Sequence, residues 1–144
     1  MKILVINGPN INMLGIRNTD IYGKQDFNSL ISYVNSYAIA HNVKTEFFQS
    51  NSEGEIITAI QNSVGNFDGI IINAGGYSHT SIAIMDAIDA TNIPCIDVHL
   101  SNIHAREDFR DKSYIARASV GQICGFGFKS YTMAIDALKD IIND

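Results

Sequence analysis

The sequence has few residues of several types, and each shortage narrows what the protein can be. It has no tryptophan, two prolines and only two cysteines in 144 residues. Cys95 and Cys124 lie in separate apolar segments without a CxxC pattern, so we expect two reduced thiols and no disulfide framework. This cysteine usage is typical of a cytoplasmic protein, and we expect that location.

Long apolar runs and basic residues are also scarce. No apolar segment reaches the roughly 20 residues of a membrane-spanning helix, and the opening MKILVING becomes polar too early for a signal peptide. Ten Lys and Arg against fifteen Asp and Glu give a net charge of −5. We therefore expect neither a membrane nor a nucleic acid as a partner, because phosphate binding needs a basic surface.

The residues that are present alternate between short apolar segments and longer amphipathic ones. Segments 26–41, 53–64, 79–91 and 129–143 space their apolar residues as on one face of a helix, and Asp26 is the expected N-cap of the first. This alternation predicts an α/β fold, a single flavodoxin-like domain over 1–144. Its doubly wound parallel sheet has five strands in the order 2-1-3-4-5, with helices on both faces. The expected strands are 2–7, 43–50, 67–75, 93–100 and 118–127.

Polar segments follow the first, third and fourth expected strands. Ligands of such sheets bind beyond the carboxyl ends of the strands, where the winding reverses. Each polar residue taken alone has a structural interpretation, such as a turn-forming asparagine or a solvated arginine. Their joint position at one edge of the sheet favours a ligand site instead. The candidate residues are Asn10, Asn12, Arg17, Tyr22, Asn73, Ser78, His79, Thr80, Asp97, His99, Ser101, Asn102, His104, Arg106 and Arg110.

Positive charge gathers in these segments although the chain is acidic. Arg17, Arg106 and Arg110 join His79 and His99 there, which predicts a small anionic ligand such as a carboxylate. The first strand is not followed by GxGxxG and the chain has no GxxxxGK[ST], which disfavours dinucleotides, ATP and GTP. The histidines lack zincin spacing and have few acidic neighbours, so we expect no metal.

Four motifs resemble type II 3-dehydroquinase (3-dehydroquinate dehydratase): GPNINMLGIR…YG, NAGGYSHTSIAIMDAI, DVHLSNIHAREDFR…SYI and GQICGFG. They occur in the family's order over nearly the whole chain. The resemblance implies a hydro-lyase of the shikimate pathway that converts 3-dehydroquinate into 3-dehydroshikimate. The reaction is a trans elimination of water through an enolate, with no metal or cofactor. The resemblance also implies a homo-oligomer, a dodecamer built from four trimers.

The same resemblance implies a role for individual residues. Tyr22 would be the base, with Arg17 on the same loop as its activator, and His99 would be the acid. Asn10 would hold a water against the enolate oxygen. The implied substrate contacts are Asn73, His79 and Arg110 for hydroxyl groups, Leu100 and Ser101 for the carboxylate, and Asp86 for a neighbouring subunit's site.

The chain departs from the family pattern at a few positions. Asp97 stands where a glutamate usually orients the histidine. It lies two residues from His99 on the same face of a strand, and we expect it to act through a water or a shifted backbone. Ala74 and Gly76 replace the common Pro and Ala, which predicts a looser turn. Met85 replaces a common arginine, which predicts an altered trimer contact.

The chemistry is physically consistent with these assignments. An unperturbed tyrosine has a pKa near 10, so a tyrosine base needs a cation beside it. A cation about 4 Å away at an effective dielectric of about 20 favours the phenolate by roughly 4 kcal/mol, and burial opposes this gain. Arg17 lies five residues before Tyr22. We therefore predict that the loop over about residues 8–23 is a catalytic lid whose closure excludes water.

Two other hypotheses use the same fold. A non-catalytic module that binds a small anion would keep the basic edge of the sheet but would not need Tyr22, Arg17 and His99 together. A flavin or nucleotide binder would need phosphate-cradling Gly, Ser and Thr after the first strand, where this chain has GPNINML. We expect the dehydratase.

Overall fold

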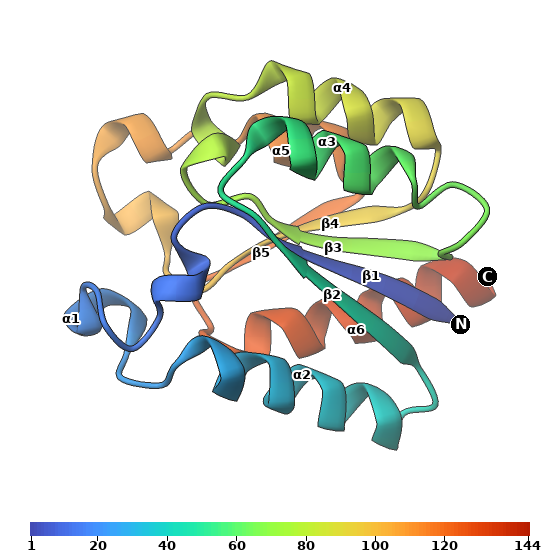
Figure 1. The fold of residues 1–144 in the computed structure, drawn as a ribbon, viewed down its shortest axis with the longest axis horizontal. Coiled ribbons are helices and arrows are strands. Elements are labelled where there is room, and N and C mark those ends of the chain that lie inside the picture. Colours follow the sequence, from blue (N-terminus) through green and yellow to red (C-terminus); the bar gives the residue numbers. More distant parts are fainter.

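A five-stranded parallel sheet forms the centre of the structure, a computed structural model that describes all of residues 1–144 (Figure 1). The strand order is β2-β1-β3-β4-β5, which is the flavodoxin-like order that the sequence predicts. The predicted fold class is thus confirmed. The strands are β1 (Lys2–Asn7), β2 (Lys44–Gln49), β3 (Gly69–Asn73), β4 (Cys95–His99) and β5 (Gly121–Cys124).

Helices cover both faces of the sheet (Figure 1). Helices α2 (Phe27–Ala40) and α6 (Lys129–Asn143) lie on one face, and α3 (Glu53–Gln61), α4 (Ile82–Thr91) and α5 (Tyr114–Ala118) lie on the other. Successive residues of β1 point to opposite faces, so Ile3 and Val5 join the core under α2 and α6, and Leu4 and Ile6 join the core under α3 and α4. No helix combines the length and the apolar character needed to cross a membrane.

Most predicted elements are present, with shifted ends. Asp26 caps α2, as predicted, by accepting a hydrogen bond from the Ser29 backbone N–H at 2.8 Å. The helix predicted from residue 79 begins at Ile82, because Ser81 caps it and residues Gly75–His79 form a short 3-10 helix. The strand predicted over 118–127 is limited to Gly121–Cys124.

Two short helices were not predicted. Helix α1 (Thr19–Tyr22) lies inside the expected lid, and α5 lies almost entirely between the fourth and fifth expected strands, where we assigned no element. Four or five residues are too few to show a helical period in the sequence. Ser113 caps α5 by accepting a hydrogen bond from the Ala116 backbone N–H at 3.1 Å.

The two cysteines are both free thiols. Cys95 is buried in β4, and burial raises the pKa of its thiol to about 12. A thiol held in this state is a core residue and not a nucleophile at neutral pH.

Candidate active site

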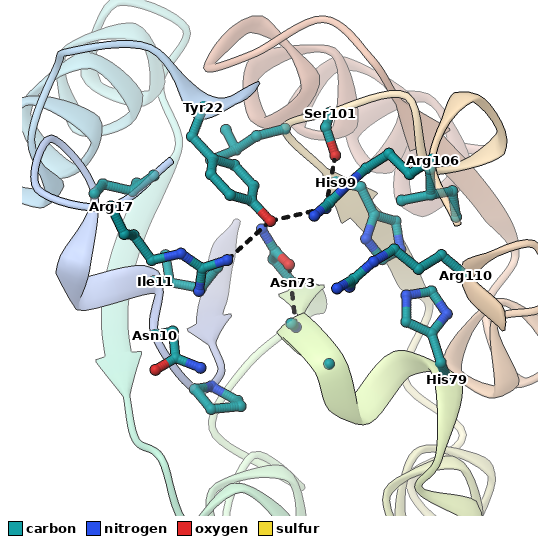
Figure 2. A pocket seen from close by; sticks show the side chains of 16 residues that line it. Asn10, Ile11, Arg17, Tyr22, Asn73, His79, His99, Ser101, Arg106 and Arg110 are labelled. Atoms are coloured by element: carbon teal, nitrogen blue, oxygen red, sulfur yellow. Dashed lines mark hydrogen bonds between the residues drawn. The ribbon is translucent and has the colours of Figure 1, made fainter. Parts of the chain in front are cut away.

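The three polar segments meet in one pocket at the carboxyl edge of the sheet (Figure 2). It lies beyond β1, β3 and β4, the position expected for this winding. Nine of the residues to which the family resemblance assigns a role line it. These nine are Asn10, Arg17, Tyr22, Asn73, His79, His99, Leu100, Ser101 and Arg110.

Close backbone contacts shape the start of the loop from Gly8 to Gly23. A Cβ atom at Gly8 would lie 2.5 Å from the carbonyl oxygen of Ala74, so only glycine fits there. Asn10 follows with a left-handed φ of 68°. This turn places the Asn10 side chain at the pocket and sends the chain on toward α1, which carries Tyr22.

Gln49, the last residue of β2, and Asn51, two residues later, hold the start of this loop, and the sequence did not indicate either of them. The side chain of Asn51 accepts a hydrogen bond from the Asn10 backbone N–H at 3.1 Å. The Gln49 amide donates to the Gly8 carbonyl at 3.2 Å and to the Asn12 side chain at 3.3 Å. Asn10 therefore has a fixed backbone, while its side chain is exposed at the pocket.

The phenol oxygen of Tyr22 lies between two arginines (Figure 2). Arg17 Nη2 donates to it at 3.0 Å, and Arg106 Nη1 donates at 2.8 Å from the other side of the pocket. Both guanidinium groups also lie near the face of the tyrosine ring, 4.8 and 5.3 Å from its centre. Two cationic donors on one oxygen stabilise its negatively charged form.

Arg106 was among the candidate residues at this edge of the sheet, but the family resemblance assigned it no role. Its contact with Tyr22 joins residues 84 positions apart in the chain. The one signal for it in the sequence is its spacing of four residues from Arg110 in a segment already assigned to the site. Arg106 also lies 3.5 Å from the Ser101 hydroxyl, which it approaches as a donor.

His99 is the last residue of β4 and is 5% exposed. Its Nε2–H donates to Asp97 Oδ2 at 3.0 Å. We expected this shorter acid to act through a water or a shifted backbone, and the first alternative is wrong, because the contact is direct. Because Nε2 is engaged, Nδ1 is the ring nitrogen left to serve the pocket.

His79 faces His99 across 6.2 Å between ring centres. Its Nδ1–H donates to the Lys112 carbonyl at 2.7 Å, so the other nitrogen, Nε2, is an acceptor in the neutral ring. Burial, helped by the charges of His99 and Arg110, lowers the pKa of His79 below the ordinary value, although the Lys112 carbonyl opposes the shift. A neutral His79 can accept a hydrogen bond from a ligand hydroxyl.

We expect His79 to titrate below the ordinary histidine value of 6.5, because its neutral form is favoured in the fold. An NMR titration of the imidazole carbons, with the signal assigned through His79→Asn, measures the midpoint. A midpoint at or above 6.5 would show that His79 carries a proton at mildly acidic pH and is not held as an acceptor.

Asn73, at the end of β3, is oriented from inside the fold. Its Nδ2 donates to the hydroxyl of Tyr131 at 3.0 Å, and its Oδ1 accepts from the Gly75 backbone N–H at 3.2 Å. The Tyr131 hydroxyl donates in turn to Asn7 Oδ1 at 2.6 Å. Tyr131 is fully buried, and burial raises its pKa, so its hydroxyl remains protonated.

Tyr131→Phe is expected to lower the free energy of unfolding by about 1–3 kcal/mol, the usual cost of leaving buried polar groups unpaired. Asn73 and Asn7 would each lose their contact with the hydroxyl. Urea unfolding measures the loss, and Tyr33→Phe, at an exposed site on α2, is the control. An unchanged unfolding midpoint would contradict the importance of this network.

The ionisable side chains that line the pocket are mostly basic, and none is a carboxylate. Its 16 lining residues include three arginines and two histidines but no aspartate or glutamate. Glu107 lies outside the lining and accepts a hydrogen bond from Arg110 Nε at 2.6 Å. The chain also contains no group of three His, Cys, Asp or Glu that could hold a metal ion. The arrangement fits a small anion with hydroxyl groups.

Comparison with known proteins agrees with this geometry. The family model described as Dehydroquinase class II matches residues 1–139. The chain belongs to the class II dehydroquinase family. A 3-dehydroquinate dehydratase from Caldicellulosiruptor saccharolyticus is 59% identical over 142 residues, which is 98% of either chain.

Solved structures of class II dehydroquinases share the fold. The type II dehydroquinase from Butyrivibrio crossotus has a TM-score of 0.95 and 49% identity, and the alignment covers 96% of this chain and 97% of that one. The enzyme from Propionibacterium acnes has a TM-score of 0.91 and 36% identity, with 99% and 97% covered. The family resemblance seen in the sequence is therefore confirmed.

Of the residues with an assigned role, Asp97 and Asp86 do not line the pocket of this class II dehydroquinase, and five further candidates also lie outside its lining: Asn12, Ser78, Thr80, Asn102 and His104. Asp97 is fully buried behind His99. Asp86 is exposed on α4 and lies outside the pocket of its own chain. Near the departures Ala74 and Gly76, the turn contains a hydrogen bond from the Tyr77 N–H to the Ala74 carbonyl at 3.2 Å. A looser turn and an altered contact at Met85 stay predictions.

Proposed function

We propose that this protein is a 3-dehydroquinate dehydratase that forms 3-dehydroshikimate by trans elimination of water. The observation that carries the proposal is the Tyr22 oxygen, which accepts hydrogen bonds from Arg17 and Arg106 at the edge of a pocket without acidic residues. The name and close similarity of the Caldicellulosiruptor saccharolyticus relative support the substrate. The reaction would belong to the shikimate pathway in the cytoplasm.

In the first step, Tyr22 acts as the base. Its phenolate removes a proton from C2 of the substrate, next to the C3 ketone, and the electron pair moves onto the ketone oxygen to give an enolate. Arg17 and Arg106 stabilise the phenolate through the hydrogen bonds at 3.0 and 2.8 Å. Asn10, whose side chain is exposed at the pocket, holds a water against the enolate oxygen.

In the second step, His99 acts as the acid. The enolate electrons form the C1=C2 double bond and restore the ketone, while the bond between C1 and its hydroxyl breaks. His99 gives a proton to this hydroxyl, which leaves as water. Asp97 accepts the Nε2–H of His99 at 3.0 Å, so it stabilises the charged imidazole before transfer and leaves Nδ1 to donate.

The remaining residues would hold the substrate. The carboxylate binds at Leu100 and Ser101, beside Arg106. The hydroxyl groups contact Asn73, Arg110 and the acceptor Nε2 of His79, which the Lys112 carbonyl orients. These groups already lie in place through contacts within the chain, which lowers the cost of ordering them on binding.

The loop over about residues 8–23 is the proposed lid. Tyr22, on α1, crosses the pocket to contact Arg106, so lid closure brings the base to its second cation. Opening of the lid would remove Tyr22 from Arg106 and admit substrate. In this scheme the tyrosine is fully activated only when the pocket is closed and water is excluded.

We also propose the dodecamer of four trimers in which Asp86 reaches a neighbouring site. Exposed apolar side chains, among them Ile16, Ile82 and Phe109, offer surface for such contacts. We expect light scattering to give a mass about twelve times the 15.8 kDa of one chain. A monomeric mass in a fully active preparation would contradict both the assembly and the role of Asp86.

Purified protein mixed with 3-dehydroquinate, with and without a chelator, tests the proposed reaction. The conjugated enone of 3-dehydroshikimate absorbs in the ultraviolet, so product formation is followed directly. We expect equal rates with and without the chelator, because protein side chains supply the base and the acid. Well-folded protein that binds the substrate but forms no product would favour the anion-binding module instead.

A further inference from the structure

The buried carboxylate of Asp97 receives all of its hydrogen bonds on one oxygen. Oδ2 accepts from His99 Nε2 at 3.0 Å, from the Ser113 hydroxyl at 2.8 Å and from Gln122 Nε2 at 2.9 Å. Oδ1 is buried and has no hydrogen-bond partner. Because Asp97 is 0% exposed, water does not replace a lost donor easily, and each of the three contacts matters for a buried charge.

In two of these hydrogen bonds, the partner of Asp97 can only be the donor. The side-chain nitrogen of Gln122 can donate but cannot accept. The Ser113 oxygen already accepts the Ala116 backbone N–H at 3.1 Å as the cap of α5, so its own hydrogen points to Asp97. Oδ2 is therefore an acceptor toward both. The hydrogen between Asp97 and His99 then belongs to His99 Nε2, which selects the tautomer of the ring.

The parallel pairing of β4 with β5 sets the position of Gln122. Asp97 and Gln122 are partners in the register, so their side chains project from the same face of the sheet at neighbouring positions. Gln122 is itself exposed on an edge strand, where a glutamine is usually a solvated residue. Here its amide reaches inward to a carboxylate that is fully buried.

We propose that Gln122 is a positioning residue for His99, acting through Asp97. With Ser113, it fixes Oδ2 where the short aspartate side chain meets Nε2 of His99, and so it aims Nδ1 at the departing hydroxyl. This inference rests on the proposed role of His99 as the acid. In this arrangement Asp97 on β4 holds His99, and Ser113 at the start of α5 and Gln122 on β5 hold Asp97.

The test replaces the donor and keeps the length of the side chain. Gln122→Met is expected to lower kcat about tenfold, the effect of one hydrogen bond to a charged group, with KM changed less than about twofold. Gln122→Glu keeps the shape but places a second carboxylate beside Asp97, so we expect a larger loss of kcat. Gln61→Met, at an exposed site on α3, is the matched control and should leave both constants unchanged.

An NMR measurement separates this inference from the proposed reaction. In the unaltered protein, the Nε2–H proton of His99 is expected as a resolved, exchange-protected signal, and in Gln122→Met it should broaden or exchange faster. If the unaltered protein forms no product while this signal behaves as expected, the reaction is wrong and the positioning stands. An active enzyme in which Gln122→Met changes neither kcat nor the signal would overturn the positioning role.

Discussion

Tyr22→Phe is expected to lower kcat for 3-dehydroshikimate formation by about three orders of magnitude, within the range for loss of a general base. The substitution removes the oxygen atom that Arg17 and Arg106 both contact and leaves the ring in place. KM is expected to change little, because the proposed substrate contacts lie on other residues. Steady-state rates at saturating 3-dehydroquinate measure the effect.

Tyr33→Phe is the matched control for this substitution. Tyr33 is 45% exposed on α2 and packs near Phe128, with ring centres 5.8 Å apart. Loss of its hydroxyl should leave kcat unchanged. If Tyr22→Phe kept more than about a tenth of the activity, another group would have to remove the C2 proton.

The second large effect is expected for the two arginines on Tyr22. Arg17→Met and Arg106→Met should each lower kcat by about tenfold to a hundredfold, since a hydrogen bond to a charged group contributes about 1.5–3 kcal/mol. The loss should fall mainly on kcat for Arg17, which lies on the lid with the base. Arg106 also lies 3.5 Å from Ser101, so we expect Arg106→Met to raise KM as well.

The double variant and a control sharpen this prediction. Arg17 and Arg106 contact the same oxygen, so their effects should not add, and a double-mutant cycle measures the coupling. Arg117→Met removes an exposed arginine from α5 and should leave kcat and KM unchanged. An unchanged kcat in Arg17→Met would exclude Arg17 as the activator.

The sheet and the place of the site could be predicted because they depend on local patterns. Strands such as 2–7 are short apolar runs, and helices such as 129–143 show the helical spacing of apolar residues over a long segment. The order of these two kinds of segment along the chain indicates the winding of the sheet. The winding then indicates which strand ends carry the ligand. Motif resemblance added the roles of Tyr22, Arg17 and His99, which their position at the edge of the sheet had marked only as candidates for a ligand site.

The missed features depend on contacts between distant segments. Arg106 reaches Tyr22 only because the lid folds across the pocket, 84 residues away in the chain. Gln49 and Asn51 act on the lid through the pairing of β2 with β1. Gln122 reaches Asp97 through the register of β4 and β5. None of these pairings leaves a periodic signal in the sequence.

The direct contact between Asp97 and His99 shows the same limit. From the sequence, we expected the shorter acid to act on the histidine through a water or a shifted backbone. In the structure, adjacent positions on one face of β4 bring the two groups to 3.0 Å, and donors from α5 and β5 hold the carboxylate in place. That Ser113 and Gln122 hold the shorter side chain of Asp97 can be seen only in the three-dimensional arrangement of α5, β4 and β5.

The fate of deuterium at C2 of 3-dehydroquinate tests most directly whether Tyr22 on the lid and His99 on β4 carry out a trans elimination. Two substrates are needed, each labelled at one of the two C2 positions, and mass spectrometry of the 3-dehydroshikimate reads the label. We predict loss of the deuterium on the face opposite the departing hydroxyl and retention of the one on the same face. The reverse pattern would contradict trans elimination and the assignment of base and acid to these two residues.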